Sequence, residues 1–412
     1  MTDTMTSADF IALEDKYGAH NYHPLPVVLD RGEEVFVWDV EGKRYFDYLS
    51  AYSAVNQGHC HPRIIQALTS QAQKLTLTSR AFYNSQLGIF EEYITKLLGY
   101  DKVLMMNSGA EAVETALKLC RKWGYQKKGI SEGHAKIIFA TENFHGRTLA
   151  IVSASTDPQS KAGFGPYMPG LEVIPYNNLQ ALRDIILEDP HIAGVILEPI
   201  QGEAGVKVPD EGYLKGVQEL CQTANVLFIA DEIQTGLART GKMLCVDHSG
   251  VRPDIVILGK ALSGGTLPVS AVLADDDVML CIKPGEHGST YGGNPLACAV
   301  AKESLQVILD EDLSEKSAIL GQIFREALIS FAKECPLIKD VRGKGLLNAV
   351  EINTTEEDSM AWDICLALKE KGLLAKPTHG NKIRFAPPLV ISKEQLEESL
   401  QIIKDTFREF DL

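Results

Sequence analysis

The sequence predicts an α/β protein whose large domain has a mostly parallel central sheet flanked by helices, followed by a smaller α+β domain. Apolar runs at 193–197, 226–230 and 255–258 are typical of buried strands and follow one another at intervals of about thirty residues. All three lead into ionisable side chains, which is the layout of an α/β sheet with its active site at the carboxyl ends of the strands. The expected division is an N-terminal segment over 1–50, a large domain over 51–295 and a small domain over 296–412.

Composition sets limits on the class of protein. A chain of 412 residues that is 45% hydrophobic can bury a large core and form roughly two or three domains. The net charge of −15 argues against nucleic acid or an anionic membrane as a partner. No apolar run reaches the roughly 18 to 20 residues that span a bilayer. The eight cysteines are scattered without a C-x-x-C pair, so reduced thiols and a cytoplasmic location are expected, although an organelle leader could precede this chain.

The first fifty residues are expected to be rich in loops and to lead into a hairpin over 34–47, where two short runs flank a Glu-Gly turn. Tyr22 and Tyr52 lie in segments without a clean period and could be core or interface aromatics. The segment His59-Cys60-His61 is interpreted as structural and not as a metal site, because adjacent residues on a short extended run cannot converge on one metal ion.

Lys260 is the most informative residue of the chain, because it follows the apolar run 255–258 on a glycine-rich turn. Lysine is strongly hydrated and rarely ends a β-branched core strand unless its amine is held or used, although a snorkelling surface lysine is the ordinary alternative. Glu198 and Asp231, which follow the two preceding apolar runs, favour an active site. A buried, partly neutral amine can form a Schiff base with a carbonyl substrate or with pyridoxal phosphate (PLP).

PLP makes two further demands on the chain. Its protonated pyridine nitrogen requires a buried carboxylate, which Asp231 can supply, and its phosphate requires backbone N–H groups at the start of a helix. The strand expected over 103–107 is followed by Ser108, Gly109 and Ala110, which open an amphipathic helix. A cofactor-free Schiff-base aldolase would leave both features unexplained.

Two loops carry further candidate residues. After the strand expected over 136–140 come Phe144, His145 and Arg147, where the phenyl ring could stack on a planar ring and the guanidinium could bind a carboxylate in bidentate fashion. The alternative is a loop anchored by Phe144 with Arg147 in a surface ion pair. Glu203, in a glycine-flanked loop, is either a solvated acid or a gate.

The segment 236–243 nearly matches the phosphate loop of nucleotide hydrolases. Met243 stands where that loop needs a magnesium-binding hydroxyl, and no amphipathic helix follows, so nucleotide hydrolysis is rejected.

The rest of the chain completes the large domain and then changes character. A strand over 269–274 is followed by a polar turn with Ser289 and Thr290 and by a helix from about 296 to 309. Arg384 lies on one of the later strands and could reach the cleft between the domains. The other elements expected in the small domain are helices near 313–334, 357–372 and 393–410 and strands near 345–352 and 382–386.

These features together resemble the class III, fold-type I PLP-dependent aminotransferases along nearly the whole chain. The segments that carry the resemblance are 21–26, 230–237, 259–265 and 384–389. The resemblance implies that Lys260 holds PLP as a Schiff base and shuttles the proton, while Asp231 keeps the pyridine nitrogen protonated. It also implies that Phe144 stacks on the ring and that Gln234 bonds the phenolic oxygen.

The resemblance assigns the phosphate to Ser108, Gly109 and Ala110, with Ser289 and Thr290 reaching it from a partner subunit. A homodimer with active sites completed across the interface is therefore expected.

Two more residues are expected in the cofactor pocket, Glu198 and His145. The imidazole of His145 stands where some relatives carry a bulky aromatic, and it can titrate near neutrality.

The implied activity is transfer of the δ-amino group of L-ornithine to 2-oxoglutarate by a ping-pong mechanism, giving glutamate and glutamate 5-semialdehyde, which cyclises to pyrroline-5-carboxylate. Tyr22, Tyr52 and Arg147 are the expected contacts for ornithine, and Arg147 and Arg384 those for the two carboxylates of 2-oxoglutarate. Glu203 is expected to pair with Arg384 during the ornithine half-reaction.

Several other functions share the cofactor residues. The nearest are transamination of N-acetylornithine or 4-aminobutyrate, and the intramolecular glutamate semialdehyde aminomutase reaction. Tyr22 favours ornithine, because a free α-amino group needs an acceptor that an acetylated one does not. A catalytically silent binding protein is disfavoured by the intact Asp231 and Lys260.

Overall fold

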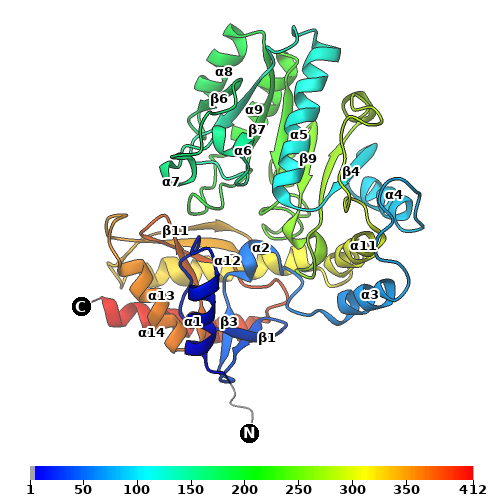
Figure 1. Ribbon diagram of the computed structural model, residues 1–412. Helices are drawn as coiled ribbons and strands as arrows, with labels where there is room; N and C mark the ends of the chain where they lie inside the picture. The colour runs from blue at the N-terminus through cyan, green and yellow to red at the C-terminus, as the bar shows by residue number, and fades with distance from the viewer. Residues whose placement is uncertain (1–4, 412) are drawn as a thin grey trace.

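The computed structural model describes residues 5–411. Two lobes are visible in Figure 1: an upper lobe built on a seven-stranded sheet, and a lower lobe that holds the N-terminal strands together with the C-terminal part of the chain. Among residues 5–411, no helix has both the length and the apolar character needed to cross a membrane.

The seven-stranded sheet confirms the expected mostly parallel arrangement. Its order is β4-β10-β9-β8-β7-β5-β6, and within it only β10 runs antiparallel to its neighbours. Four neighbouring strands, β7 to β10, are buried along their full length, as expected for strands covered on both faces. The strands are β4 Lys102–Met106, β5 Lys136–Ala140, β6 Leu171–Ile174, β7 Ile192–Leu197, β8 Leu227–Asp231, β9 Ile255–Leu258 and β10 Ser270–Ala274.

Helices cover both faces of this sheet. The helix α5, Gly109–Trp123, forms one apolar core with one face of the strands, and α8 (Leu179–Glu188) and α9 (Tyr213–Thr223) pack against the other. A capping box starts α5: the side chain of Ser108 accepts from the N–H of Glu111, whose carboxylate accepts from the N–H of Ser108. The expected helix at this position is therefore confirmed.

The C-terminal part of the chain forms an antiparallel sheet of order β11-β12-β15-β14. Its strands are β11 Ile338–Lys344, β12 Leu347–Ile352, β14 Lys376–Thr378 and β15 Lys382–Phe385, and its helices are α12 Leu313–Ala332, α13 Met360–Glu370 and α14 Lys393–Phe410. All three helices and the strands β12 and β15 were expected. The sequence analysis missed β11 and β14, which are edge strands: β11 is largely polar, and β14 contains a proline.

The N-terminal hairpin is confirmed by β2 (Phe36–Asp39) and β3 (Arg44–Asp47), which are antiparallel. They join β1 (Leu29–Glu33) and the short β13 (Leu373–Leu374), which is parallel to β3 and ties the segment to the C-terminal part of the chain. The boundaries proposed at residues 50 and 295 stay a prediction.

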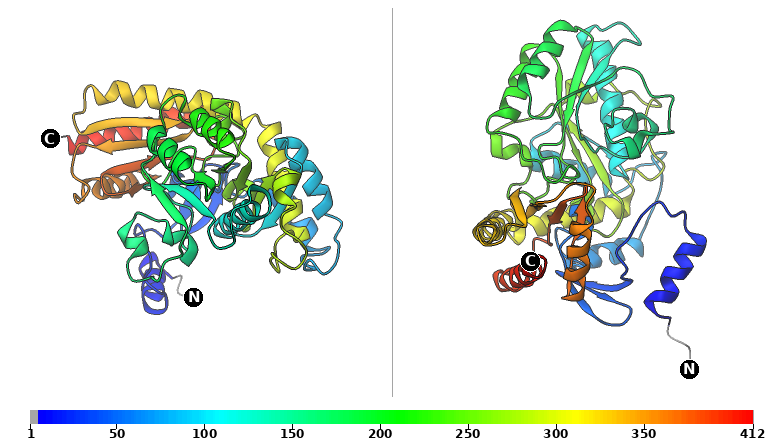
Figure 2. Two further views of the ribbon diagram at one scale, coloured as in Figure 1. Left: turned by 90° about the horizontal axis from the view of Figure 1, so that it is seen from above. Right: turned by 90° about the vertical axis from the view of Figure 1, so that its left-hand side faces the viewer.

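The expectation of a loop-rich start was wrong over α1, Ser7–Tyr17. This helix begins at a capping box of Thr6 and Asp9, but none of its residues is buried, so no apolar stripe marks it in the sequence. In both views of Figure 2, α1 lies at the periphery of the molecule.

Short helices and connections complete the fold. The helix α11, Pro295–Asp310, confirms the helix expected from about residue 296. It contacts α3 (Pro62–Ala72), α4 (Leu87–Leu98) and α12. The remaining α-helices are α2 Ser50–Ser53, α3 Pro62–Ala72, α4 Leu87–Leu98, α6 Leu149–Ser153, α7 Pro158–Lys161, α10 Asp276–Met279 and α11 Pro295–Asp310.

The loop that resembles a nucleotide-hydrolase motif joins distant parts of the chain. The buried guanidinium of Arg239 donates to Asn56 Oδ1 at 2.6 and 3.1 Å, to the carbonyl of Leu346 at 3.1 Å and to that of Pro387 at 2.6 Å. Burial lowers the pKa of Arg239 to about 9. Only a short 3-10 helix follows the loop, at Cys245–Ser249.

We expect Arg239→Met to lower the free energy of unfolding by about 3 kcal/mol, because it leaves buried oxygens without donors. Chemical denaturation measures the change, with Arg408→Met on the exposed side of α14 as the control, for which at most about 0.5 kcal/mol is expected. Equal stability of the two variants would contradict the role assigned to Arg239.

Candidate active site

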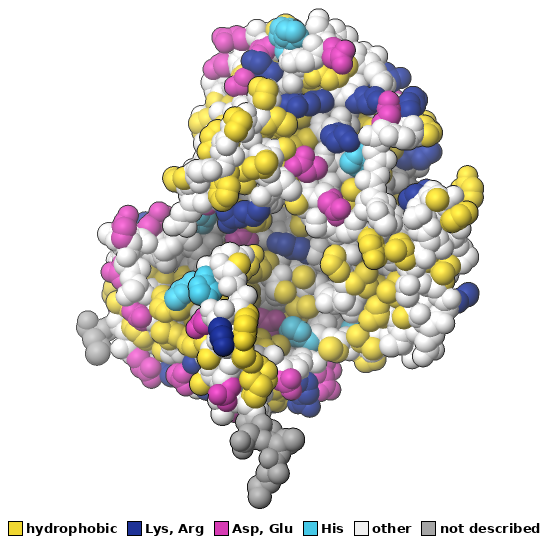
Figure 3. All heavy atoms as spheres, in the orientation of Figure 1, with side chains coloured by type: hydrophobic (Ala, Val, Ile, Leu, Met, Phe, Trp, Pro, Cys, Tyr) yellow, Lys and Arg dark blue, Asp and Glu magenta, His cyan; other side chains and the backbone are white. Residues whose placement is uncertain are grey.

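The predicted cofactor residues converge at the carboxyl edge of the central sheet. Because β7, β8 and β9 are adjacent and parallel, the residues that end or follow them lie at one edge: Glu198, Asp231 and Lys260. They line a cavity of ≈ 210 Å³, and Figure 3 shows the surface hollowed between the two lobes, with basic side chains in the hollow. The other lining residues are Gly109, Ala110, Phe144, His145, Gly146, Ile233, Gln234 and Thr235.

Lys260 is held in an uncommon backbone conformation. Its φ of 44° lies in the left-handed region, where a residue with a side chain is strained, and such strain is found where the surrounding structure imposes it. Burial lowers the pKa of Lys260 to about 8; the charge of Glu203 opposes this shift, and that of Arg384 adds to it. About a tenth of the amine is therefore neutral, and hence nucleophilic, at pH 7, far more than for an ordinary lysine.

Asp231 forms a buried pair with His145 that the sequence analysis did not anticipate. The His145 Nδ1 atom lies 2.7 Å from Asp231 Oδ2, and Asp231 Oδ1 accepts from the N–H of Ile233 at 3.1 Å. Burial alone would lower the pKa of His145, but the hydrogen bond and charge of Asp231, together with the charge of Glu198, raise it. The sequence marked His145 only as a group that titrates near neutrality, since nothing in it gives the distance to Asp231.

Glu198 connects two loops of the site. One carboxylate oxygen accepts from the N–H of Phe144 at 2.8 Å, and the other accepts from the N–H of Gly202 at 3.3 Å. Burial raises the pKa of Glu198 to about 7, while the charge of His145 opposes this shift. Glu198 therefore positions the aromatic loop and the loop that carries Glu203, a role that the strand-end signal did not reveal.

The expected pair of Glu203 and Arg384 is formed. Arg384 Nη1 and Nη2 lie 3.0 and 3.1 Å from the two carboxylate oxygens of Glu203, and the guanidinium side chain is only 3% exposed. Gln234 completes the cluster, because its amide oxygen accepts from Arg384 at 2.8 Å and its amide nitrogen donates to Glu203 at 3.0 Å. Although burial of Glu203 favours its neutral form, the charge and hydrogen bonds of Arg384 lower its pKa to about 2.

Tyr52 lies beside this cluster. Its ring centroid is 4.8 Å from the Arg384 guanidinium carbon and 5.7 Å from Lys260 Nζ. Tyr52 itself has a positive φ of 60°. The structure therefore brings Tyr52 together with Lys260 and Arg384, as expected for a residue near the substrate.

Two other expected substrate residues lie away from the cavity wall. Tyr22 is 79% exposed. The side chain of Arg147 is 61% exposed, donates to Ser160 and lies 3.9 Å from Asp157, with its guanidinium carbon 5.3 Å from the centroid of the Phe144 ring. Their roles in substrate binding stay predictions.

The expected phosphate site lies at the start of α5. Among the described residues, the N–H groups of Gly109 and Ala110 have no hydrogen-bond acceptor. Ser289 is close by, because its hydroxyl accepts from the amide of Asn107 at 2.7 Å within the same chain. The expectation that Ser289 and Thr290 reach the phosphate of a partner subunit stays a prediction.

The residues at this edge fit PLP. A buried carboxylate, Asp231, faces the same cavity as the lysine amine, and the open N–H groups of Gly109 and Ala110 can donate hydrogen bonds to a phosphate. Between residues 5 and 411, no group of three potential metal ligands is present. The fold and the site define a PLP-dependent enzyme of fold type I.

Comparison with known proteins gives the family. Residues 17–407 match the model of the class-III aminotransferases, and the chain belongs to this family. It is 65% identical to the mitochondrial ornithine aminotransferase of Drosophila melanogaster over 395 residues, which are 96% of this chain and 90% of the relative. The chain is thus a PLP-dependent aminotransferase.

Two solved structures are similar over nearly the whole chain. The acetylornithine aminotransferase of Elizabethkingia anophelis is 60% identical with a TM-score of 0.92, and the match covers 99% of this chain and 100% of that one. The ornithine aminotransferase of Toxoplasma gondii, crystallised with partial occupancy of PLP at its active site, is 48% identical with a TM-score of 0.96, covering 99% and 95%.

The lowered pKa of Lys260 predicts unusual reactivity in the cofactor-free protein. Competitive acetylation followed by mass spectrometry should give a half-maximal rate for Lys260 near pH 8, because only the neutral amine reacts. Exposed Lys316 on α12 serves as the internal reference. Arg384→Ala should move the Lys260 midpoint upward, since it removes a positive charge and leaves Glu203 unpaired, and a Lys260 midpoint above about 9.5 in the wild type would contradict the assignment.

Proposed function

We propose that this enzyme transfers the δ-amino group of L-ornithine to 2-oxoglutarate, forming glutamate and glutamate 5-semialdehyde in a ping-pong reaction. The observation that supports it best is the buried pair of Glu203 and Arg384 beside Lys260. Ornithine has to place its δ-amine near Lys260 and its carboxylate far away. An Arg384 already neutralised by Glu203 does not draw that carboxylate toward Lys260.

The second substrate has the opposite requirement. 2-Oxoglutarate carries a carboxylate at each end, so it needs two cationic contacts, for which Arg147 and Arg384 are proposed. Release of Arg384 by Glu203 supplies the inner contact. The ornithine α-carboxylate and α-amine are proposed to bind at the outer end of the site, at Arg147 and Tyr22, with Tyr52 beside the path to Lys260.

The cofactor residues act together. When bound, PLP supplies an aldehyde that accepts the amino group and an electron-withdrawing ring. Lys260 would hold the cofactor covalently, and its amine, whose pKa is about 8 in this structure, would be the group that takes up and returns the proton. Asp231, held by His145, would keep the pyridine nitrogen protonated, and Phe144 would stack on the ring.

The remaining contacts complete the proposed cofactor site. Gln234 bonds the phenolic oxygen, and the start of α5 from Ser108 to Ala110 holds the phosphate. We further propose a homodimer in which Ser289 and Thr290 reach the phosphate of the partner subunit. The cytoplasmic location is also a proposal, since the Drosophila relative is named mitochondrial.

N-acetylornithine is the second candidate substrate, because the Elizabethkingia relative is named an acetylornithine aminotransferase. The two substrates differ in the α-amino group, which is free and charged only in ornithine. Tyr22 is the proposed acceptor for that charged group, and its 79% exposure leaves its hydroxyl accessible.

Isotope transfer tests the proposed function. The holoenzyme should move the label from L-[δ-¹⁵N]ornithine into glutamate when 2-oxoglutarate is present, and L-[α-¹⁵N]ornithine should label glutamate far more slowly. Mass spectrometry of the glutamate gives the result. Faster turnover of N-acetylornithine than of ornithine would move the assignment to that substrate.

Removal of the Glu203 charge should weaken selection of the δ-amine. We expect Glu203→Gln to raise α-label transfer relative to δ-label transfer by roughly tenfold, because the unpaired Arg384 then attracts the ornithine carboxylate; tenfold corresponds to about 1.4 kcal/mol. The same labelled substrates measure the ratio. Glu92→Gln, an exposed acid paired with Lys96 on α4, is the control and should leave the ratio unchanged.

A further inference from the structure

The loop that carries Glu203 belongs to the upper lobe, but its backbone is held by the lower lobe. We call residues 202–206 the Glu203 loop. The hydroxyl of Thr378, on β14, donates to the carbonyl of Glu203 at 2.7 Å. Two residues further along, the carbonyl of Gly205 accepts from Nε of Arg342, on β11, at 2.8 Å. Both edge strands of the four-stranded C-terminal sheet therefore bind this loop.

The upper lobe holds other groups of the loop. The flanking residues Gln201 and Lys207 exchange two backbone hydrogen bonds, and within the loop the N–H groups of Gly205 and Val206 both donate to the carbonyl of Gly202 at 3.2 Å. In the described part of the chain, the hydroxyl of Thr378 is the only donor to the carbonyl of Glu203. Loss of that hydroxyl would thus release the peptide group on the C-terminal side of the Glu203 Cα atom.

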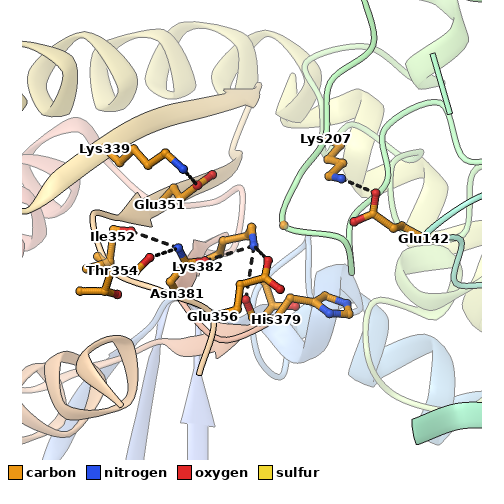
Figure 4. A network of polar contacts seen from close by, with 12 residues as sticks. Glu142, Lys207, Lys339, Glu351, Ile352, Thr354, Glu356, His379, Asn381 and Lys382 are labelled. Atoms are coloured by element: carbon orange, nitrogen blue, oxygen red, sulfur yellow. Dashed lines mark hydrogen bonds and ion pairs between the residues drawn. The ribbon is translucent and has the colours of Figure 1, made fainter. Parts of the chain in front are cut away.

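The contact between loop and lower lobe is close. Gly205 has a φ of +91°, and a Cβ at this position would overlap the side chain of Lys382. Figure 4 shows the contacts of Lys382 with Glu356, at 2.5 Å, and with Asn381 Oδ1, at 3.1 Å, and the ion pair of Lys339 with Glu351, at 2.7 Å. The lower lobe thus presents an ordered surface to the loop.

Arg342 is itself restrained. Its Nη1 atom lies 2.7 Å from Asp340 Oδ2 and 2.8 Å from Glu351 Oε2, which leaves Nε directed at the carbonyl of Gly205. The guanidinium therefore contacts the loop with a fixed geometry, and not as a freely rotating surface side chain.

We propose that Thr378 is a positioning residue that determines which amine of the substrate reacts, with Arg342 as a second support; this inference rests on the proposed function. The two residues fix the backbone of the Glu203 loop relative to Arg384, which lies on β15 of the same sheet. Glu203 and Arg384 then separate by rotation of the Glu203 side chain alone, and the resting pair re-forms in one geometry after each turnover.

The loss of this anchor has a defined consequence. Without the Thr378 hydroxyl, the Glu203 backbone samples more positions, and the pair with Arg384 is populated less. Arg384 is then more often free to bind the ornithine carboxylate, which brings the α-amine to Lys260. One hydrogen bond of this kind changes a ratio by about three- to tenfold.

The test compares the holoenzymes of Thr378→Val and Thr378→Ser with the wild type, using ornithine labelled with ¹⁵N at the α or the δ position. Valine keeps the shape of threonine without its hydroxyl, and serine keeps the hydroxyl. We expect the δ-to-α transfer ratio to fall about three- to tenfold for Thr378→Val and to stay within about twofold of the wild type for Thr378→Ser.

Thr406→Val is the matched control, because Thr406 is a buried threonine of α14 that donates to the carbonyl of Ile402 at 2.8 Å, away from the site. Thr406→Val should lower the midpoint of thermal unfolding without changing the δ-to-α transfer ratio. Arg342→Lys keeps the positive charge but lacks the Nε–H donor, so it should also lower the δ-to-α transfer ratio. This variant replaces Thr378→Val in the test if Thr378→Val does not fold.

Each outcome decides between the two proposals. If the wild type transfers the δ label and both Thr378→Val and Arg342→Lys keep its ratio, the positioning role is overturned and the contacts only stabilise the fold. If the wild type transfers no δ label, the proposed function fails and the inference fails with it.

Discussion

The compensation of buried charge is the constraint on which the site depends. Six ionisable side chains, Lys260 among them, meet at the carboxyl edge of β7, β8 and β9 or close to it, where an unpaired charge is costly. Each has a specific partner or a shifted pKa. Asp231 pairs with His145, and Glu203 pairs with Arg384. Glu198 accepts hydrogen bonds from backbone N–H groups, while burial raises its pKa to about 7.

The central sheet explains why these groups meet. Adjacent parallel strands end at one edge, so residues separated by long stretches of sequence reach one cavity. The loops that follow the strands are then fixed by the same charges, since Glu198 binds the N–H groups of Phe144 and Gly202. The strand ends therefore bring the charged side chains together, and those side chains in turn hold the loops that follow the strands.

This also explains how much the sequence could predict. The strands β7 to β9 are continuous apolar runs, and the ionisable residues that end or follow them, Glu198, Asp231 and Lys260, indicate the site directly. The edge strands β11 and β14 and the exposed helix α1 have no such pattern, because their side chains face solvent or alternate irregularly. Glu203 and Arg384 could be paired in advance from the charges of the proposed substrates. The pair of His145 and Asp231 and the anchor from Thr378 depend on tertiary distances, for which a histidine or a threonine in a sequence gives no signal.

The different exposure of the two site arginines bears on the proposed reaction. Arg147 is largely exposed, so water solvates its charge whether or not a carboxylate is bound, whereas Arg384 is almost fully buried. A buried guanidinium is costly without a counter-charge. Departure of Glu203 is therefore favourable only when another carboxylate takes its place, and the inner carboxylate of 2-oxoglutarate is such a group. In the proposed reaction, exchange of one carboxylate for another at Arg384 keeps the local charge constant, which lets one site accept a substrate with a distal amine and then a diacid.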